Sequence, residues 1–95
     1  MSKVVRDGKV AVLVSPGYGA GWSTWNHRDL CFCPPMVAWV EGGKVGEPPV
    51  PEDVFGGGAE QLKIVWVDEG VQFKITEYDG AESIEFRDSG DWVTA

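Results

Sequence analysis

The segment KVVRDGKVAVLVS, residues 3–15, decides the fold because it predicts the strand around which the rest of the chain packs. Asp7-Gly8 is a dipeptide that adopts the positive φ values of a type I′ turn, so the segment predicts a hairpin of residues 3–6 and 9–14. Along residues 9–14 valines alternate with an alanine and a leucine. Both faces are therefore apolar, which predicts a central strand that is buried on both sides.

Residues 33–43, CPPMVAWVEGG, predict the next regular element, a short helix. Pro34 and Pro35 suit a first turn, and Gly42-Gly43 ends the helix. From residue 59 onward apolar residues recur with a period of two, which predicts three antiparallel strands, each with one apolar face. We expect residues 68–70 to join the first pair of these strands as a hairpin and residues 78–80 to join the second. Residues 91–95 add a short edge piece.

These elements predict an α+β fold, with a small antiparallel sheet of about five or six strands and one short helix packed on a face. The 95 residues suffice for a single domain, residues 1–95. Within it, residues 44–58, KVGEPPVPEDVFGGG, predict a loop rich in proline and glycine. No apolar run approaches 18 residues and the first residues do not resemble a secretion signal, so we expect a protein of the cytoplasm that spans no membrane.

Charge is distributed unevenly along the chain. Residues 1–48 carry five Lys or Arg and four Asp or Glu, whereas residues 49–95 carry three and eleven, and the net charge is −7. Direct nucleic-acid binding normally needs the opposite sign, because phosphate contacts dominate its affinity. The acidic half instead favours a basic protein partner, or it is simply a solubilising surface.

The stretch SPGYGAGWSTWN, residues 15–26, holds the densest group of binding-capable residues. Glycines after a central strand allow backbone N–H groups to approach a ligand, tryptophans can stack on a flat group, and Ser, Thr and Asn donate hydrogen bonds. The alternative is a tight crossing whose tryptophans fill the core. The pattern matches neither G-x-G-x-x-G nor a P-loop, and we predict no cofactor. The predicted ligand-binding residues are Gly17, Tyr18, Gly19, Gly21, Trp22, Ser23, Thr24, Trp25, Asn26 and Arg28.

HRDLCFC, residues 27–33, contains the few residues that suit a metal ion or nucleophilic chemistry. Zinc needs a fourth ligand beyond His27, Cys31 and Cys33, and the chain has no second histidine. A Cys–His pair oriented by Asp29 is the hydrolase alternative, and the spacing does not specify it. We therefore predict no metal site and no catalytic residue, and expect structural cysteines on one side of a strand.

Acidic side chains follow the last two predicted strands. Carboxylates spaced along a strand can imitate a line of phosphates and occupy a basic surface. The alternative is a solvated face whose charges prevent aggregation at a sheet edge. The predicted partner-binding residues are Glu77, Asp79, Glu82 and Glu85.

The stretches VAVLVSPGYGAGWSTWN, GGAEQLKIVWV and ITEYDGAESIEF together resemble a group of short bacteriophage and prophage proteins without an assigned activity. The resemblance covers roughly the first 26 residues and residues 57–86. It implies a non-enzymatic phage accessory protein in the host cytoplasm that binds and blocks a host defence protein, as anti-CRISPR inhibitors do. The alternative is a sponge that sequesters a nucleotide immune signal through residues 17–26. Small sheets with open edges often pair, so a homodimer also stays open.

Overall fold

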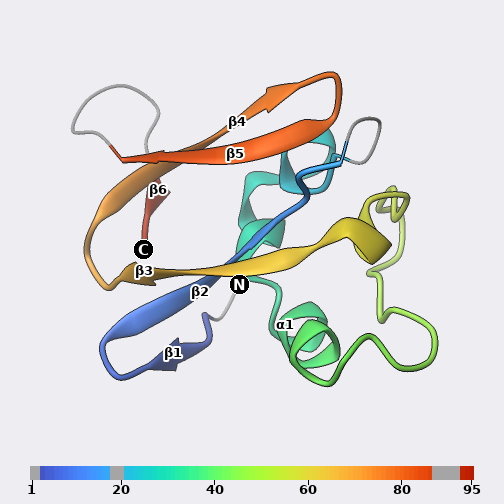
Figure 1. Cartoon of the computed structure of the whole chain (residues 1–95), viewed down its shortest axis with the longest axis horizontal. Helices are drawn as coiled ribbons and strands as arrows, with labels where there is room; N and C mark the ends of the chain where they lie inside the picture. Colours follow the sequence, from blue (N-terminus) through green and yellow to red (C-terminus); the bar gives the residue numbers. More distant parts are fainter. Residues whose placement is uncertain (1–2, 18–20, 87–92) are drawn as a thin grey trace.

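A computed structural model describes residues 3–17, 21–86 and 93–95. Within these ranges the chain forms two three-stranded antiparallel sheets and one α-helix (Figure 1). The first sheet has the order β1 (Val5–Arg6), β2 (Lys9–Val14) and β3 (Lys63–Asp68), and the second has the order β5 (Ala81–Phe86), β4 (Gln72–Tyr78) and β6 (Val93–Thr94). The predicted α+β class, the number of strands and the short helix are confirmed.

Strand β2 lies at the centre of the molecule, as its two apolar faces predict. Asp7 and Gly8 form the turn before it with φ values of 51° and 76°. β1 pairs with one edge of β2, and all six residues of β3 pair with the other edge. Residues 10–14 are buried. Side chains leave β2 on both of its faces into the interior, so the strand lies between two hydrophobic cores.

The two cores use opposite faces of β2. Ala11 and Leu13 pack in the core that includes α1 (Pro34–Glu41), which begins at the proline pair and ends before Gly42, as predicted. The three valines of β2 face the second core, which includes Phe73 and Ile84 of the other sheet. This second core joins the two sheets. The helix α1 packs only against the first core, the one that contains Ala11 and Leu13.

The six strands divide between two sheets because residues 68–70 do not form the predicted hairpin. β3 pairs with β2, whereas β4 pairs with β5 and β6. The N–H of Glu69 donates to the carbonyl oxygen of Gly8, and the N–H of Gly70 donates to that of Ala95. These bonds tie the turn to the first hairpin and to the chain terminus, so it carries the chain from one sheet to the next.

The β4–β5 hairpin matches the prediction. Asp79 and Gly80 form its turn with φ values of 54° and 89°. The register places Ile75 opposite Ile84 and Glu77 opposite Glu82, so the apolar face of the hairpin continues into a pair of carboxylates near the turn. This register brings Glu82 to the segment that follows β2.

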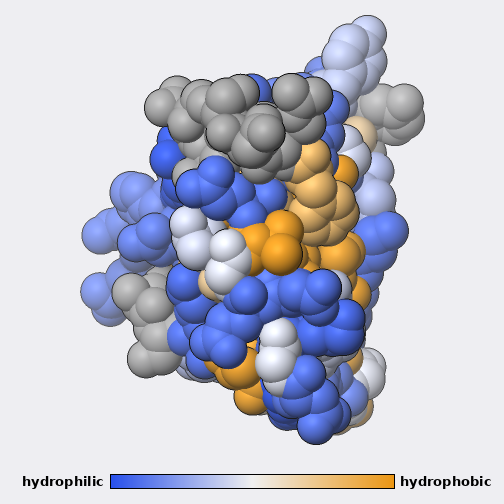
Figure 2. All heavy atoms as spheres, turned by 90° about the vertical axis from the view of Figure 1, so that its left-hand side faces the viewer, coloured by the Kyte–Doolittle hydropathy of each residue, from blue (hydrophilic) through white to orange (hydrophobic). Residues whose placement is uncertain are grey.

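Residues 44–58 contain neither helix nor strand. The Asn26 side chain attaches this loop to the segment after β2, donating to the carbonyl oxygen of Phe55 at 3.0 Å and accepting from its N–H at 2.9 Å. No helix in the described ranges is long and apolar enough to cross a bilayer. Figure 2 shows one side of the molecule as largely hydrophilic, with hydrophobic residues visible near its centre and toward its right-hand edge.

Candidate functional site

The segment after β2 forms two short 3-10 helices, η1 (Ser23–Trp25) and η2 (Arg28–Phe32). Of the predicted ligand-binding residues, Tyr18 and Gly19 lie outside the described residues. Gly17 is half-buried, and a Cβ at its position meets the side chain of Gln61. The rest of the predicted site lies in η1 and η2 or directly beside η1, where one side of the segment faces the molecule and the other faces outward.

The inner side of this segment binds the carboxylate of Glu82. Oε2 of Glu82 accepts from the N–H of Trp22 at 2.9 Å and the N–H of Thr24 at 3.0 Å, and also from the Thr24 hydroxyl. Oε1 accepts from the N–H of Ser15 at 3.0 Å. Glu82 is only 4% exposed, so its charge is balanced inside the protein by these donors.

The glycine-containing stretch therefore does hold an anion on its backbone amides, and that anion comes from its own chain. The N–H groups of Trp22 and Thr24 are not available for an external phosphate, contrary to the prediction for this stretch. Glu82 is likewise not placed for a partner, because it is buried against this segment. Both corrections have one cause: the β4–β5 register aims Glu82 at the end of β2.

Trp22 is a core residue and has no exposed face for a ligand. It is 0% exposed, packs in the helix-side core, and donates its indole N–H to the carbonyl oxygen of Leu30 at 2.8 Å. A buried indole needs such an acceptor. Stacking of Trp22 on a flat ligand is thus wrong, and the alternative of a tight crossing filled by tryptophan is correct for this residue.

Trp25, in contrast, lies on the outer side of the segment. It is 42% exposed and its ring lies 5.7 Å from that of Phe55, which is 50% exposed, with an interplanar angle of 38°. A Cβ on Gly21 would clash with the Trp25 ring, and a Cβ on Gly57 would clash with the Phe55 ring. Each ring thus lies directly against a glycine, which holds the exposed aromatic pair in place.

The indole N–H of Trp25 also donates to Oε2 of Glu77 at 2.9 Å. The same oxygen accepts from the N–H of Gly80 at 2.7 Å. These two hydrogen bonds, that of Trp25 first, lower the pKa of Glu77 from its ordinary value of 4.5. Glu77 therefore orients Trp25 while it remains a surface carboxylate. Asp79 and Glu85, the other two acidic residues predicted to bind a partner, are exposed.

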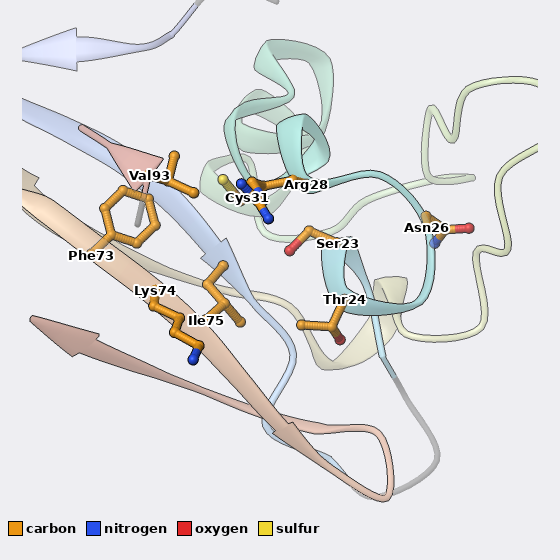
Figure 3. A pocket seen from close by; sticks show the side chains of 9 residues that line it. All are labelled: Ser23, Thr24, Asn26, Arg28, Cys31, Phe73, Lys74, Ile75 and Val93. Carbon is orange, nitrogen blue, oxygen red and sulfur yellow. The ribbon is translucent and has the colours of Figure 1, made fainter. Parts of the chain in front are cut away.

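A pocket of about 370 Å³ lies between η1 and η2 on one side and β4 and β6 on the other (Figure 3). The predicted ligand-binding residues supply four of its nine lining residues, and the others come from η2 and from strands far along the chain. The lining residues are Ser23, Thr24, Asn26, Arg28, Cys31, Phe73, Lys74, Ile75 and Val93.

The five lining residues that the sequence did not indicate are apolar or belong to regular strands. Phe73 and Ile75 follow the period of a half-buried strand, which predicts a core face and carries no signal of a cavity. Only the packing of β4 and β6 against η2 leaves space beside them. The alternation of polar and apolar residues in β4 was the one available signal. It predicts which face of β4 is buried, but it does not predict that η1 and η2 lie opposite that face.

Cys31 is buried in η2 and is protonated at neutral pH. Burial, followed by the nearby charges of Asp29 and Glu82, raises the pKa of its thiol to about 12. The Cys–His alternative depends on a thiolate, and this environment disfavours one. The described part of the chain also contains no group of three His, Cys, Asp or Glu that would hold a metal ion.

Cys31 and Cys33 are both free and buried, as structural cysteines are. Their position differs from the prediction, because they lie in and just after a 3-10 helix and not on a strand. Pro34-Pro35 starts α1 directly after them, so the chain has no room for an extended segment here.

Comparison of the chain with protein-family models, with curated proteins and with solved structures gives no match in any of the three. The function is therefore argued from the geometry of the site.

Proposed function

We propose that this chain is a non-enzymatic protein that acts by binding a partner protein through Trp25, Phe55 and the turn of the β4–β5 hairpin. The single observation that carries the proposal is the exposed Trp25–Phe55 pair, held against two glycines and oriented by Glu77. Large aromatic side chains on a surface normally lose rotamer freedom when they bind. This pair has already lost most of that freedom in the free protein, which lowers the entropy cost of association.

Aromatic anchors of this kind are typical of binding hot spots. Tryptophan is enriched among the few residues that supply most of the energy of a protein interface, and those residues gather near its centre. Asn26 adds to the preorganisation, because its two hydrogen bonds fix the backbone of Phe55 to the end of η1. The pair therefore combines apolar area with a fixed shape.

The surroundings of the pair are acidic. Glu77 bonds to Trp25, Asp79 lies in the turn two residues further on, and Glu52 and Asp53 precede Phe55 in its loop. With a net charge of −7, the chain favours a partner with a basic surface and repels nucleic acid. Complementary charge of this kind increases the rate of association and excludes wrong partners.

The resemblance to bacteriophage proteins supplies the biological setting of the proposal. A small acidic phage protein that covers a basic surface on a host defence protein would block whatever that surface normally holds, including nucleic acid. The action is then in the host cytoplasm and needs no catalytic residue. Sequestration of a nucleotide through residues 17–26 receives less support, because Trp22 is buried and the amides nearest to it already bind Glu82.

The proposal is tested by affinity capture from a bacterial lysate with matched variants. The wild-type chain retains a partner, and the double variant Trp25→Ala, Phe55→Ala loses it. Phe86→Ala is the control, because Phe86 is also an exposed aromatic residue but lies outside the pair. A partner captured equally by all three proteins contradicts the assigned surface.

A second measurement tests the role of charge once a partner is in hand. Asp79→Asn removes one charge beside the pair, and asparagine tolerates the positive φ of that turn position. We expect slower association at low salt and little change at high salt. Glu47→Gln is the matched control, because it removes one exposed charge eight residues before Phe55 in the same loop. Plating of a defence-sensitive phage on cells that express each variant then tests the block: the wild type restores plaques and the double variant does not.

A further inference from the structure

The pocket between η1–η2 and β4–β6 is a second candidate site, separate from the aromatic pair. Its two walls differ in chemistry. Ser23, Thr24 and Arg28 are on the wall formed by η1 and η2, and Phe73, Ile75 and Val93 are on the wall formed by the sheet (Figure 3). A pocket with a few polar groups facing an apolar wall is typical of small-molecule sites, and about 370 Å³ lies within their usual range.

Ser23 is a buried polar residue whose side chain has no hydrogen-bond partner among the residues that the structure describes. The residue is 5% exposed and its hydroxyl makes no hydrogen bond to another described residue, but no fully enclosed side-chain N or O atom of the described residues lacks a partner, so this hydroxyl is reached from the pocket. Figure 3 shows this hydroxyl pointing into the pocket. Buried hydroxyl groups are nearly always hydrogen-bonded, so an Oγ that points into a cavity without a protein partner needs one from the solvent or from a ligand.

Arg28 extends from η2 over the same space, toward the wall formed by β4 and β6 (Figure 3). Within the described ranges its guanidinium forms neither an ion pair nor a hydrogen bond, whereas Arg6 is paired with Glu41. A guanidinium presents five donors in a fork that matches a carboxylate or phosphate. The pocket therefore has a cation and a hydroxyl donor on one wall.

The opposite wall is mainly apolar, and Lys74, which also lines the pocket, is the one basic residue that the sheet contributes to it. Phe73 and Ile75 project toward the pocket, whereas the side chain of Lys74, between them in the strand, is directed away from Arg28 (Figure 3). Cys31 contributes a buried thiol. The buried carboxylate of Glu82 lies nearby, bonded to Thr24. One guanidinium beside a buried carboxylate suits a single negative charge better than the double charge of a phosphate monoester.

We infer that this pocket binds a small organic monoanion, a carboxylate attached to an apolar or flat body. Arg28 takes the carboxylate, Ser23 donates to one of its oxygens, and the body lies against Phe73, Ile75 and Val93. This site is independent of the proposed protein-binding function, because it uses none of the side chains of the aromatic pair.

The inference is tested by titrating ¹⁵N-labelled protein with benzoate and hexanoate and following the backbone amide signals. Benzamide is the neutral counterpart of benzoate, and adenosine monophosphate is the phosphate probe. We expect the amides of Ser23, Arg28 and Ile75 to shift with both carboxylates, with a Kd of about 1 mM for such small molecules. Benzamide and adenosine monophosphate should bind at least about tenfold more weakly.

Variants then test the assigned contacts. Arg28→Gln should weaken benzoate binding by about 10-fold to 100-fold, because it removes a charge-assisted hydrogen-bonded contact. Ser23→Ala should weaken it by about 2-fold to 10-fold. Lys63→Gln is the matched control, since it removes one exposed positive charge from β3 and lies outside the pocket. The amide spectrum of each variant shows directly that it is folded.

Four results would overturn the inference. One is the absence of pocket shifts with either carboxylate at about 10 mM, which is well above the expected Kd. A second is benzamide binding as tightly as benzoate, which would leave Arg28 without a role. A third is preferential binding of adenosine monophosphate, which would assign the pocket to phosphates. The fourth is equal weakening by Arg28→Gln and Lys63→Gln, which would reduce the effect to net charge.

Discussion

The two sides of residues 21–28 are built from the same short segment and have opposite relations to their surroundings. On the inner side, the amides of Trp22 and Thr24 bind the carboxylate of Glu82, and the Trp22 indole is sealed in the core. On the other side, Trp25 is exposed, whereas the buried Ser23 and the exposed Arg28 line the pocket between this segment and β4 and β6. The inner side has its polar groups satisfied, whereas the outer side leaves polar and aromatic groups available.

This difference shows that a loop whose backbone N–H groups can bind an anion need not bind an external one, because a carboxylate of the same chain can take that place. Two features of the sequence suggested two separate external partners: a glycine-containing loop for a phosphate and an acidic strand for a basic surface. The fold brings Glu82 of the acidic strand to the amides of the loop, so the two features satisfy each other. An external partner can then bind only to groups of this segment that do not take part in the contact with Glu82.

Loss of the Glu82 carboxylate should have the largest effect and tests whether the inner side is structural. Glu82→Gln places an NH₂ group against backbone N–H donors, whichever way the amide turns. We expect the free energy of unfolding to fall by about 2–4 kcal/mol, because buried donors lose their charged acceptor. Urea denaturation measures it.

Glu85→Gln is the control for that measurement, because Glu85 lies on the same strand and is exposed. Its effect should stay within about 0.5 kcal/mol. A Glu82→Gln protein as stable as the wild type would show that the cost of burying this carboxylate cancels its hydrogen bonds. The contact on the inner side would then not stabilise the fold.

The sequence predicted most of the fold because its local signals agree with the tertiary structure. The double apolar face of residues 10–14, the Asp-Gly turn and the proline start of α1 each have one low-energy solution. The hairpin expected at residues 68–70 failed because pairing between strands is not local. β3 had an apolar face that fits β2 as well as β4, and periodicity does not rank the two partners.

The candidate site was predicted only in part for the same reason. Trp22 and Trp25 are three residues apart and chemically identical, and only the curvature of η1 buries one and exposes the other. The sequence marked Glu82 as one of several carboxylates and gave no sign that, among the carboxylates that the structure describes, it is the buried one. Ser23 and Arg28 were indicated as polar groups near the glycines, whereas the wall opposite them comes from β4 and β6.

Gly21 joins the two sides, and its substitution should have the next largest effect. A Cβ at this position clashes with the ring of Trp25, which cannot move without losing its hydrogen bond to Glu77. We expect Gly21→Ala to destabilise the protein by about 1–3 kcal/mol, as overpacking does.

Gly17→Ala is the control for this prediction, because the added methyl meets the mobile end of the Gln61 side chain and should cost less. Unfolding measured by tryptophan fluorescence gives both values. Equal effects of the two substitutions would mean that the Trp25 ring yields easily and is not held in a fixed position.

Cys31 packs in the second core, which joins the two sheets, and also lines the pocket, so its titration tests how well the protein excludes water from the thiol. The folded protein holds the thiol proton up to a pKa of about 12, against an ordinary value of 9.0. Above pH 9 the unfolded chain loses this proton and the folded chain keeps it, so stability falls as pH rises. The slope is about 1.4 kcal/mol per pH unit between pH 9 and 12.

Comparison with Cys31→Ala isolates that contribution. The difference in unfolding free energy between the wild type and the variant should shrink as pH rises from 8 to 10.5. Parallel pH profiles for the two proteins would show that water reaches the thiol, and the pocket would then extend deeper than the structure indicates.

The smallest effect is expected on the outer side, at the hydrogen bond from Trp25 to Glu77. This bond, with that of Gly80, holds the pKa of Glu77 below 4.5. Glu77 therefore stabilises the fold above its unfolded pKa, and that contribution is lost as pH falls through the lower folded pKa. Trp25→Phe keeps the aromatic ring and removes the donor, so the pKa of Glu77 should rise toward 4.5. The carboxyl ¹³C signal of Glu77, followed from pH 7 to pH 2 in the wild type and the variant, measures this pKa. An unchanged pKa of Glu77 in the variant would mean that the hydrogen bond from Gly80 alone lowers it. The orientation of Trp25 would then depend on its contacts with Gly21 and Phe55.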